Sequence, residues 1–584
     1  MSQPKLELTW IGKNNPEYDI ANIEPRILLE NPELSNTAND PNSQNMIIHG
    51  DNLLALKALL PEYAGKVKCI YIDPPYNTGN AFEHYDDSVE HSTWLSLMKP
   101  RLELLRSLLC EEGVILVQID DNEMAYLKIL MDEIFGRLSH VTTLHVEMSI
   151  TQGMKVGSAK NGNIVKNGEY ILIYSKNGRK NIASTIMYDK ADNFDIHYSI
   201  YLEKKGGIYV RQSLLNVLLN NPVIYSEFKK FNLLKNDKIS INDISVAIDL
   251  SDIVKNYVYF EISDKIFADM MINTSIDVEV EKKLDEGYII DYKGYIIGKT
   301  GNGSVRQYRS FKETLNNNDE YKSSYGRVRI RGDFWKGYYS DMMNVAKEGL
   351  VEFKNSKKPE RLVKDVLKMI TNPNDLVLDS FLGSGTTAAV AHKMGRRYIG
   401  IEMGDHAYTH CKERMDKVVD GSDQGGISRA VDWKGGGAYK FYELAPSFII
   451  KDEFDNPIID GFYNDSKLIQ AMCKLMDYTY SPSKDEYWKH GLGQGKSYIY
   501  ITTQLLTCAM VNQISSHLKE GEKLLICPKT YEPGAEKISN QITVKKIPQS
   551  VLKACHFGKK EYLLPIKEKI EIEDESEDFE TENE

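Results

Sequence analysis

An acidic residue, two prolines and a tyrosine follow an apolar run of strand type at residues 68–72, giving Asp73-Pro74-Pro75-Tyr76. Proline cannot continue the hydrogen-bond ladder of a sheet, so we expect the strand to end there, at the edge where open α/β sheets bind ligands. Proline also lacks an N–H, so the Pro74 and Pro75 carbonyls are expected to be free acceptors. With the Asp73 carboxylate and the Tyr76 ring, they suit a planar group that carries an amine, such as a base rotated out of a duplex. Alone, these four residues could equally be a plain strand-to-turn junction.

A second candidate site follows the buried strand predicted at residues 375–379. Its loop contains Gly383 and Gly385, and the next predicted strand, residues 397–402, ends at Glu402. A glycine loop between a strand and a helix lets the backbone approach a nucleotide-like ligand, and an acid about 20 residues further on meets ribose hydroxyls. The third glycine of a pyrophosphate fingerprint is missing, and a ligand without phosphates would not need it.

The elements around both sites alternate between strand and helix, which predicts a parallel, doubly wound α/β sheet. Cofactor loops normally follow the first strand of such a sheet, but here the acidic motif comes long before the glycine loop. A circularly permuted chain would explain that order. The strands at 375–379 and 398–402 would then lie beside those at 47–49 and 70–73, and Asp51 would lie near the base of the nucleoside.

Both motifs resemble those of a known family. Asp73–Tyr76 is similar to the (Asp/Asn/Ser)-Pro-Pro-(Tyr/Phe) motif of amino-group DNA methyltransferases, and residues 379–385 resemble their Phe-x-Gly-x-Gly motif for S-adenosylmethionine (SAM). The motif order is that of the beta class. Residues 6–13, 24–30 and 425–437 resemble the modification (Mod) subunit of type III restriction-modification systems, which carries target recognition where this chain has about 180–330.

This resemblance implies a Rossmann-like, circularly permuted SAM-dependent methyltransferase sheet that transfers a methyl group to N6 of a flipped adenine. It implies catalytic roles for Asp73, Pro74, Pro75 and Tyr76, and no metal. The segment at 355–360 resembles one that helps bind SAM in that class. The cofactor-binding residues expected on this basis are Asp51, Lys358, Pro359, Asp379, Ser380, Phe381, Gly383, Gly385, Thr386 and Glu402.

Two other functions stay open. N4-cytosine methylation would use the same fold and site, although in this family Asp in the motif is mostly associated with N6-adenine and Ser with N4-cytosine. A DNA-specificity subunit that delivers a helicase–nuclease partner would bind DNA with catalysis dispensable. The identity of the modified nucleoside distinguishes cytosine from adenine methylation. A specificity subunit is distinguished by retaining its role when catalysis is lost.

Changes in composition along the chain indicate the remaining domains, including a candidate DNA-binding segment. Between residues 306 and 336 bases outnumber acids and aromatic residues are interleaved, as on DNA-binding surfaces, although a solvated hairpin-rich surface looks similar. Arg306, Arg309, Arg327, Arg329 and Arg331 are the candidate DNA contacts. The expected domains are an N-terminal arm (1–45), the catalytic half (46–180), an inserted target-recognition domain (181–340), the SAM-binding half (341–420), a C-terminal α/β module (421–570) and an acidic disordered tail (571–584).

The overall composition is that of a globular protein of 584 residues with a net charge of −12, much of it in the tail. The seven cysteines are scattered without a CxxC pair, which favours a reducing cytoplasm and argues against zinc. No apolar run is long enough for a membrane span. Gly491–Ser497 resembles a Walker loop, but its spacing is one residue short and a strand, not a helix, is predicted after it. The expected partners are double-stranded DNA, a second copy of the chain and a restriction (Res) helicase–nuclease subunit.

Overall fold

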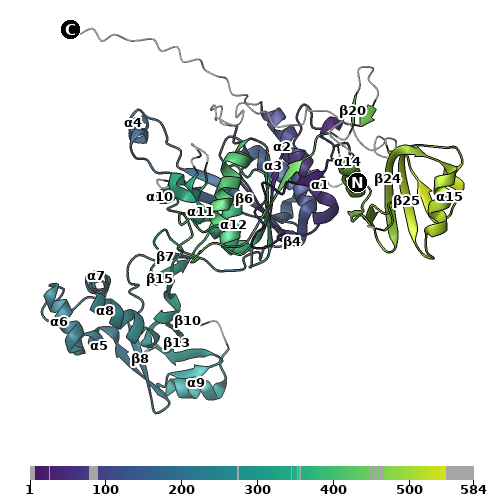
Figure 1. Cartoon of the computed structure of the whole chain (residues 1–584). Coiled ribbons are helices and arrows are strands. Elements are labelled where there is room, and N and C mark those ends of the chain that lie inside the picture. The colour runs from purple at the N-terminus through teal and green to yellow at the C-terminus, as the bar shows by residue number, and fades with distance from the viewer. Residues whose placement is uncertain are drawn as a thin grey trace, which may run out of the picture. The chain divides into compact units, whose positions relative to one another are not determined.

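The computed structural model describes residues 7–547, apart from 25, 78–89, 273–274, 301, 343–344, 352, 354–356, 448, 452–456, 460–464 and 484. The predicted acidic tail lies outside these residues. Contacts divide the chain into two compact units: residues 1–185 with 333–584, and residues 186–332 (Figure 1). The second unit overlaps the segment predicted to recognise DNA.

The first unit is built on a mixed ten-stranded sheet. The neighbours from β19 to β4 run parallel, whereas the β4–β6, β6–β5 and β1–β19 pairs are antiparallel. The strand order is β1 (Leu28–Glu30), β19 (Lys440–Leu444), β2 (Met46–His49), β18 (Arg397–Glu402), β17 (Leu376–Asp379), β3 (Val67–Ile72), β4 (Leu109–Ile119), β6 (Gly168–Ser175), β5 (His140–Glu147) and β16 (Phe334–Trp335).

This order confirms the predicted circular permutation. β17 lies between β18 and β3, and β18 pairs with β2, so strands from before and after the second unit are neighbours in the parallel part of the sheet. The expectation of a parallel sheet was wrong for β6. This strand is antiparallel, because no crossover helix returns the chain to the start of the sheet between β5 and β6. The N-terminal arm contributes β1 to the edge of the sheet.

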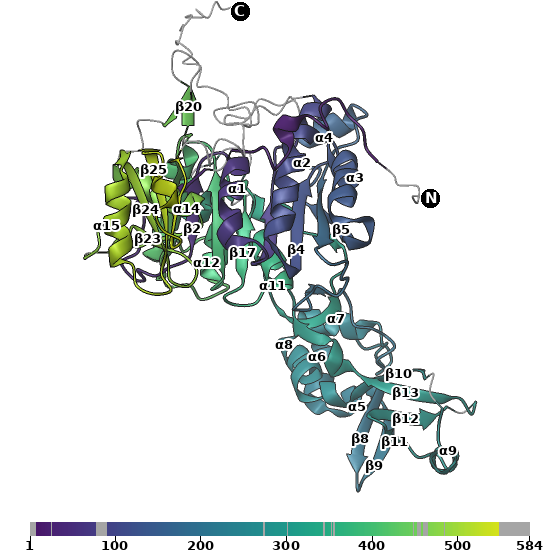
Figure 2. The same cartoon turned by 90° about the vertical axis from the view of Figure 1, so that its right-hand side faces the viewer.

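Helices cover both faces of this sheet (Figure 2). α1 (Asn52–Tyr63), α2 (His91–Leu108) and α3 (Met124–Phe135) pack against one face in a core that includes Ile70, Ile115 and Ile401. α11 (Glu360–Ile370) and α12 (Thr386–Lys393) lie on the opposite side (Figure 1). Glu90 is the N-cap of α2, and its carboxylate accepts the Ser92 N–H at 2.8 Å.

The C-terminal part carries a five-stranded sheet with α15 (Cys508–His517). The Walker-like segment lies in a hairpin between its second and third strands, and a strand follows it, as the sequence predicted. No helix N-terminus therefore meets a phosphate there. The strands are, in order, β22 (Thr479–Tyr480), β23 (Gly491–Leu492), β24 (Ser497–Leu506), β25 (Lys523–Tyr531) and β26 (Ile542–Val544).

The second unit has its own core around Phe228 and Phe311, formed by helices that include α7 (Asp243–Leu250) and α8 (Asp252–Asn256). It holds two antiparallel sheets, of six and three strands. The six-stranded order is β11 (Ile290–Tyr292), β12 (Tyr295–Lys299), β13 (Val305–Ser310), β10 (Ile266–Met271), β8 (Ile200–Lys205) and β9 (Ile208–Ser213); the other is β14 (Leu315–Asn317), β15 (Tyr325–Ile330) and β7 (Tyr188–Lys190). Across the described part of the chain, no helix is both long and apolar enough to span a bilayer.

Candidate active site

The two predicted motifs meet at the carboxyl edge of the central sheet. β3 and β17 are parallel neighbours, so Asp73, just after β3, and Asp379, at the end of β17, lie at the same edge. β6 runs antiparallel to β4, so it begins at this edge and brings Glu169 to it. The edge therefore gathers carboxylates from three strands that are far apart in the sequence.

Asp73 is half-buried at the end of β3, and its two oxygens differ. Oδ2 lies 3.1 Å from the Lys358 ammonium. Oδ1 is buried and has no hydrogen-bond donor among the described residues. Burial raises the pKa of Asp73, and the Lys358 charge opposes that shift. A buried acceptor without a donor is unfavourable, so Oδ1 is suited to a ligand N–H.

The prolines behave differently from each other. The Pro75 carbonyl accepts the indole N–H of Trp94 at 2.9 Å, so the expectation that both proline carbonyls are free is wrong for Pro75. Trp94 is a buried residue of α2, and its hydrogen bond fixes the turn after β3. No donor to the Pro74 carbonyl occurs within the described ranges. Pro74 therefore keeps an open acceptor next to Asp73, while Pro75 anchors the loop.

Tyr76 is held in a network that the sequence did not reveal. Its hydroxyl donates to Glu169 Oε2 at 2.8 Å, and the Lys358 ammonium lies 4.7 Å from its ring centroid. Glu169 Oε2 also accepts from Gln118 Nε2 at 2.5 Å. Burial alone would raise the pKa of Glu169, but Lys358 and these hydrogen bonds outweigh it and lower that pKa. Glu169 is therefore ionised at neutral pH.

The two loop glycines differ in what surrounds them. Gly383 has φ +56° and Gly385 φ +81°, conformations that favour glycine. A Cβ added to Gly383 would meet only the Phe381 carbonyl oxygen, at 4.0 Å, whereas one on Gly385 would lie 3.3 Å from Cys411 Cα. Gly383 thus faces open space, and Gly385 is needed for packing within the protein.

The two acids predicted to bind the cofactor shape this loop. Asp379 accepts the Phe381 N–H at 2.9 Å and the Thr387 hydroxyl at 2.6 Å. Burial raises the pKa of Asp379 to about 7, despite these hydrogen bonds. Glu402, at the end of β18, accepts the backbone N–H of Gly383 at 2.5 Å. Both side chains therefore hold the loop in place through hydrogen bonds to its backbone and to α12.

The remaining predicted cofactor residues have other contacts. Asp51 caps α1 through the Leu54 N–H at 3.1 Å and lies 3.1 Å from the Arg101 guanidinium, so both of its oxygens are engaged. The Ser380 carbonyl accepts from Asn52 at 2.7 Å, which ties the β2–α1 turn to the loop. Lys358 sends its ammonium to Asp73 rather than towards the glycine loop. Pro359 is the buried N-cap of α11, and Thr386 begins α12.

The profile of the family described as "DNA methylase" matches residues 67–413 of the chain. The chain belongs to the DNA methylase family. The matched range includes the Asp73–Tyr76 turn, Glu169, the second unit and the glycine loop, whereas Asp51 and Asn52 precede it.

Named relatives of this DNA methylase carry the Mod label. The "Probable type III restriction-modification enzyme HindVI Mod subunit" of Haemophilus influenzae is 38% identical over 69% of this chain and 54% of its own length. The "Type III restriction-modification enzyme EcoPI Mod subunit" of Escherichia phage P1 is 31% identical over 67% of this chain and 62% of its own. The chain thus spans a little over half the length of these relatives. A solved structure, "crystal structure of M1.HpyAVI-SAM complex", is 14% identical over 64% of this chain and 98% of its own with a TM-score of 0.27, which supports no statement about fold or cofactor.

A buried ion cluster supports the glycine loop of the methylase. Glu360 is fully buried and lies 2.9 Å from the Lys393 ammonium and 2.7 Å from the Arg414 guanidinium. Lys393 also pairs with Asp423 at 2.6 Å. Arg414 in turn donates to the Thr386 hydroxyl at 2.8 Å. The cluster therefore connects α11, α12 and the loop, and its members were not singled out from the sequence because they are scattered along it.

Replacing Glu360 by alanine is expected to destabilise the first unit strongly, since Lys393 and Arg414 would lose their shared buried counter-ion. Breaking such a buried pair costs about 3–5 kcal/mol. In a domain of this size that lowers the Tm by roughly 10 °C. Calorimetry of the full chain measures it. The control is Lys434→Ala, which removes an exposed pair with Asp432 and should change stability by less than about 1 kcal/mol. Equal Tm shifts in both variants would contradict the role of the cluster.

The five arginines predicted to bind DNA differ in accessibility. The Arg331 side chain is buried and pairs with Asp189 at 2.6 Å, so it is the least accessible of the five predicted contacts. Arg327 donates to Asp195 at 3.0 Å, and Arg306 is half-buried. Arg309 is exposed and lies 3.5 Å from Glu313. Arg329 is exposed on β15, and no partner for its side chain occurs among the described residues.

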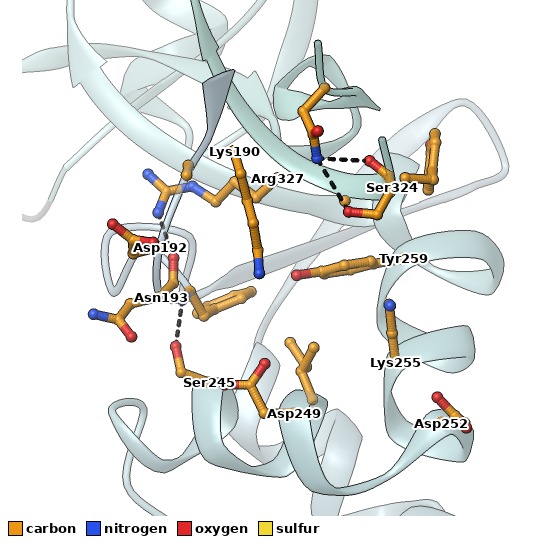
Figure 3. Close-up of a pocket in the computed structure, with 16 residues that line it drawn as sticks. Lys190, Asp192, Asn193, Ser245, Asp249, Asp252, Lys255, Tyr259, Ser324 and Arg327 are labelled. Atoms are coloured by element: carbon orange, nitrogen blue, oxygen red, sulfur yellow. Dashed lines mark hydrogen bonds between the residues drawn. The ribbon is translucent and has the colours of Figure 1, made fainter. Parts of the chain in front are cut away.

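The second unit also contains a cavity of about 270 Å³ between β7, β15, α7 and α8. Figure 3 shows Lys190 pointing into it, with Tyr259 on one side and Asp192 and Arg327 on the other. Its lining combines aromatic rings with both signs of charge, including Asp249. The cavity is thus a polar hollow beside the strand that carries Arg329.

Proposed function

We propose that this chain is a SAM-dependent DNA methyltransferase that methylates N6 of adenine, as the modification subunit of a type III restriction-modification system. The observation that carries the proposal is the buried Asp73 Oδ1, an acceptor with no donor in the described part of the chain. It lies beside the Tyr76 ring and the open Pro74 carbonyl, at the edge that the glycine loop shares. An amine on a flat ring satisfies all three features.

The residues of the glycine loop fit SAM. Gly383 leaves open space where a side chain would otherwise project, which allows close approach of a ligand to the backbone. SAM carries a sulfonium and an ammonium, and the loop is flanked by the Asp379 and Glu402 carboxylates. Phe381, which belongs to the main core, offers an apolar surface. When bound, SAM supplies an electrophilic methyl group on a positively charged sulfur that is a good leaving group.

In this proposal the chain acts by positioning. Asp73 and the Pro74 carbonyl accept the two hydrogens of the base amine, which directs its lone pair outwards. Tyr76 stacks on the base, and its hydroxyl is fixed by Glu169. The Asp73 carboxylate also favours the positive charge that develops on the amine nitrogen as it is methylated. No covalent bond to the protein is needed.

The partners follow from the same proposal. The substrate is double-stranded DNA, the chain forms a homodimer, and a Res helicase–nuclease subunit supplies cleavage. The support is that the Haemophilus and phage relatives are named as Mod subunits. Such an enzyme works in the cytoplasm, where its DNA is. The second unit and its cavity are proposed to contact the target sequence.

Transfer of tritium from methyl-labelled SAM tests this function. Purified protein with unmethylated double-stranded DNA should transfer label to DNA, and not to RNA or to added protein. Calorimetric titration of the same protein with SAM, without DNA, should show binding. SAM binding without label in DNA would contradict the proposal and favour the role of a specificity subunit.

The second unit allows a matched test of DNA binding. Arg329→Ala should weaken DNA binding and lower the salt dependence of log Kd by about 0.9, the value for one phosphate contact, without changing the Tm. Arg331→Ala, two residues away, should instead lower the stability of the unit by about 2 kcal/mol because Asp189 loses a charged partner. Fluorescence anisotropy at several salt concentrations and thermal melts measure both. Unchanged DNA affinity in Arg329→Ala would remove this residue from the proposed interface.

A further inference from the structure

Glu169 is a carboxylate of the candidate active site that lies outside both sequence motifs and was not among the predicted site residues. It lies at the start of β6, and only the antiparallel direction of that strand brings it to the carboxyl edge of the sheet. Its Oε2 receives the Tyr76 hydroxyl at 2.8 Å and the Gln118 amide at 2.5 Å. The oxygen of the same Gln118 amide accepts from the Tyr71 hydroxyl. Gln118 and Tyr71 thus fix the Glu169 carboxylate at the edge of the sheet, next to Tyr76.

The Lys358 ammonium lies where the amine of a target base would bind, next to Asp73 and over the Tyr76 ring. It lies 3.1 Å from Asp73 Oδ2, 3.4 Å from Glu169 Oε2 and 4.7 Å from the Tyr76 ring centroid. A cation that donates to Asp73 over the Tyr76 ring makes the same two kinds of contact as the amine and ring of a base. Without DNA, Lys358 is therefore shared between two carboxylates and covers one face of the Tyr76 ring.

Binding of a base changes how the Lys358 ammonium is paired. If Asp73 accepts a hydrogen bond from the base amine, its interaction with Lys358 weakens, and the ammonium loses part of its counter-charge in a buried place. An unpaired buried ammonium is strongly unfavourable. Glu169 is already in contact with Lys358 and is ionised, so it can keep the ammonium paired while Asp73 engages the base. It does so with the same oxygen that holds the Tyr76 hydroxyl.

We propose that Glu169 is a positioning residue of the methyl-transfer site, which fixes the Tyr76 ring and retains the Lys358 ammonium while Asp73 binds the amine of the target base. This inference rests on the proposed function. It assigns no contact between Glu169 and the base. Glu169 acts through Tyr76 and Lys358, and its loss should slow the methyl-transfer step more than it weakens binding of either substrate.

The test uses the full chain and DNA carrying its target site, read beforehand by sequencing DNA that the wild type has methylated. Glu169→Ala should lower kcat about 100-fold, as expected when reacting groups shift by about 1 Å, with the Kd for SAM and the KM for DNA within about threefold of wild type. Glu169→Gln keeps an acceptor for the Tyr76 hydroxyl but has no charge for Lys358, so its kcat should lie between those of Glu169→Ala and wild type. Glu112→Gln, at an exposed acid on β4, is the control and should leave kcat unchanged.

A double-mutant cycle separates positioning from a purely structural role. In a Tyr76→Phe background, which removes the hydroxyl that Glu169 holds, Glu169→Ala should cost less than in the wild type, because coupled residues are not additive. The inference is overturned if Glu169→Gln and Glu169→Ala keep kcat within about threefold of wild type, or if the two losses simply add. Failure of the proposed function looks different: the wild type itself would then leave DNA unmethylated.

Discussion

Asp73→Ala is expected to abolish methyl transfer, lowering kcat by about 1000-fold or more while the Kd for SAM stays near the wild-type value. The reason is geometric. Asp73 contributes the buried acceptor without a donor, and in the proposed complex its carboxylate lies beside the amine. Removing it leaves the Pro74 carbonyl as the only open acceptor of the motif. Single-turnover assays with labelled SAM measure the rate, and calorimetry measures SAM binding.

Asp73→Asn provides the control for this result. The amide keeps the size of the side chain and one acceptor oxygen but loses the charge, and it could no longer pair with Lys358 as an ion. We expect a rate between those of alanine and wild type. If Asp73→Ala methylates within about tenfold of the wild-type rate, Asp73 does not take the role assigned to it. If both variants also lose SAM binding, Asp73 is needed for the structure of the carboxyl edge of the sheet rather than for the reaction.

Gly383→Val is expected to block SAM binding and therefore to remove activity completely. A valine side chain would project into the open space in front of the loop, where the protein places no atom closer than 4.0 Å to a Cβ. The residue would also have to adopt a φ of +56°, which costs about 1–2 kcal/mol for a residue other than glycine. That strain is small compared with the loss of the cofactor site. Calorimetric titration with SAM measures the effect.

Gly395→Val is the matched control for that prediction. Gly395 also has a positive φ, +70°, and its added side chain would meet nothing within 4 Å, but it follows α12 at the opposite edge of the sheet. It should show similar strain in a thermal melt and keep SAM binding. Undiminished SAM affinity in Gly383→Val, or equal loss in both variants, would contradict the assignment of the glycine loop.

The sequence sufficed to predict the arrangement of the sheet because the relevant signals are local. Apolar runs ending at Asp73 and Asp379 marked two strand ends, and the reversed motif order required a permuted sheet. The structure confirms this arrangement, with β17 between β18 and β3. Strand length and position are readable from the pattern of apolar residues in the same way, which is why the strand after the Walker-like segment was also predicted correctly.

Strand direction and side-chain partners were not predictable in this way. Alternation of apolar residues is the same in both directions, so nothing in the sequence showed that β6 is antiparallel and brings Glu169 to the active site. The Pro75 carbonyl was expected to be free because proline lacks a donor, but its acceptor is used by Trp94. Arg331 is a candidate DNA contact by composition, and nothing in the sequence showed that its side chain is buried beside Asp189.

The most direct measurement is the identity of the modified nucleoside. The purified chain is incubated with SAM and unmethylated bacterial DNA, the DNA is digested to nucleosides, and these are analysed by mass spectrometry, with Asp73→Ala treated in parallel. The proposed function predicts N6-methyladenine with the wild type and none with Asp73→Ala. N4-methylcytosine would contradict the assignment to adenine while keeping the fold and the cofactor loop. No methylated base from a protein that binds SAM would contradict the proposed activity.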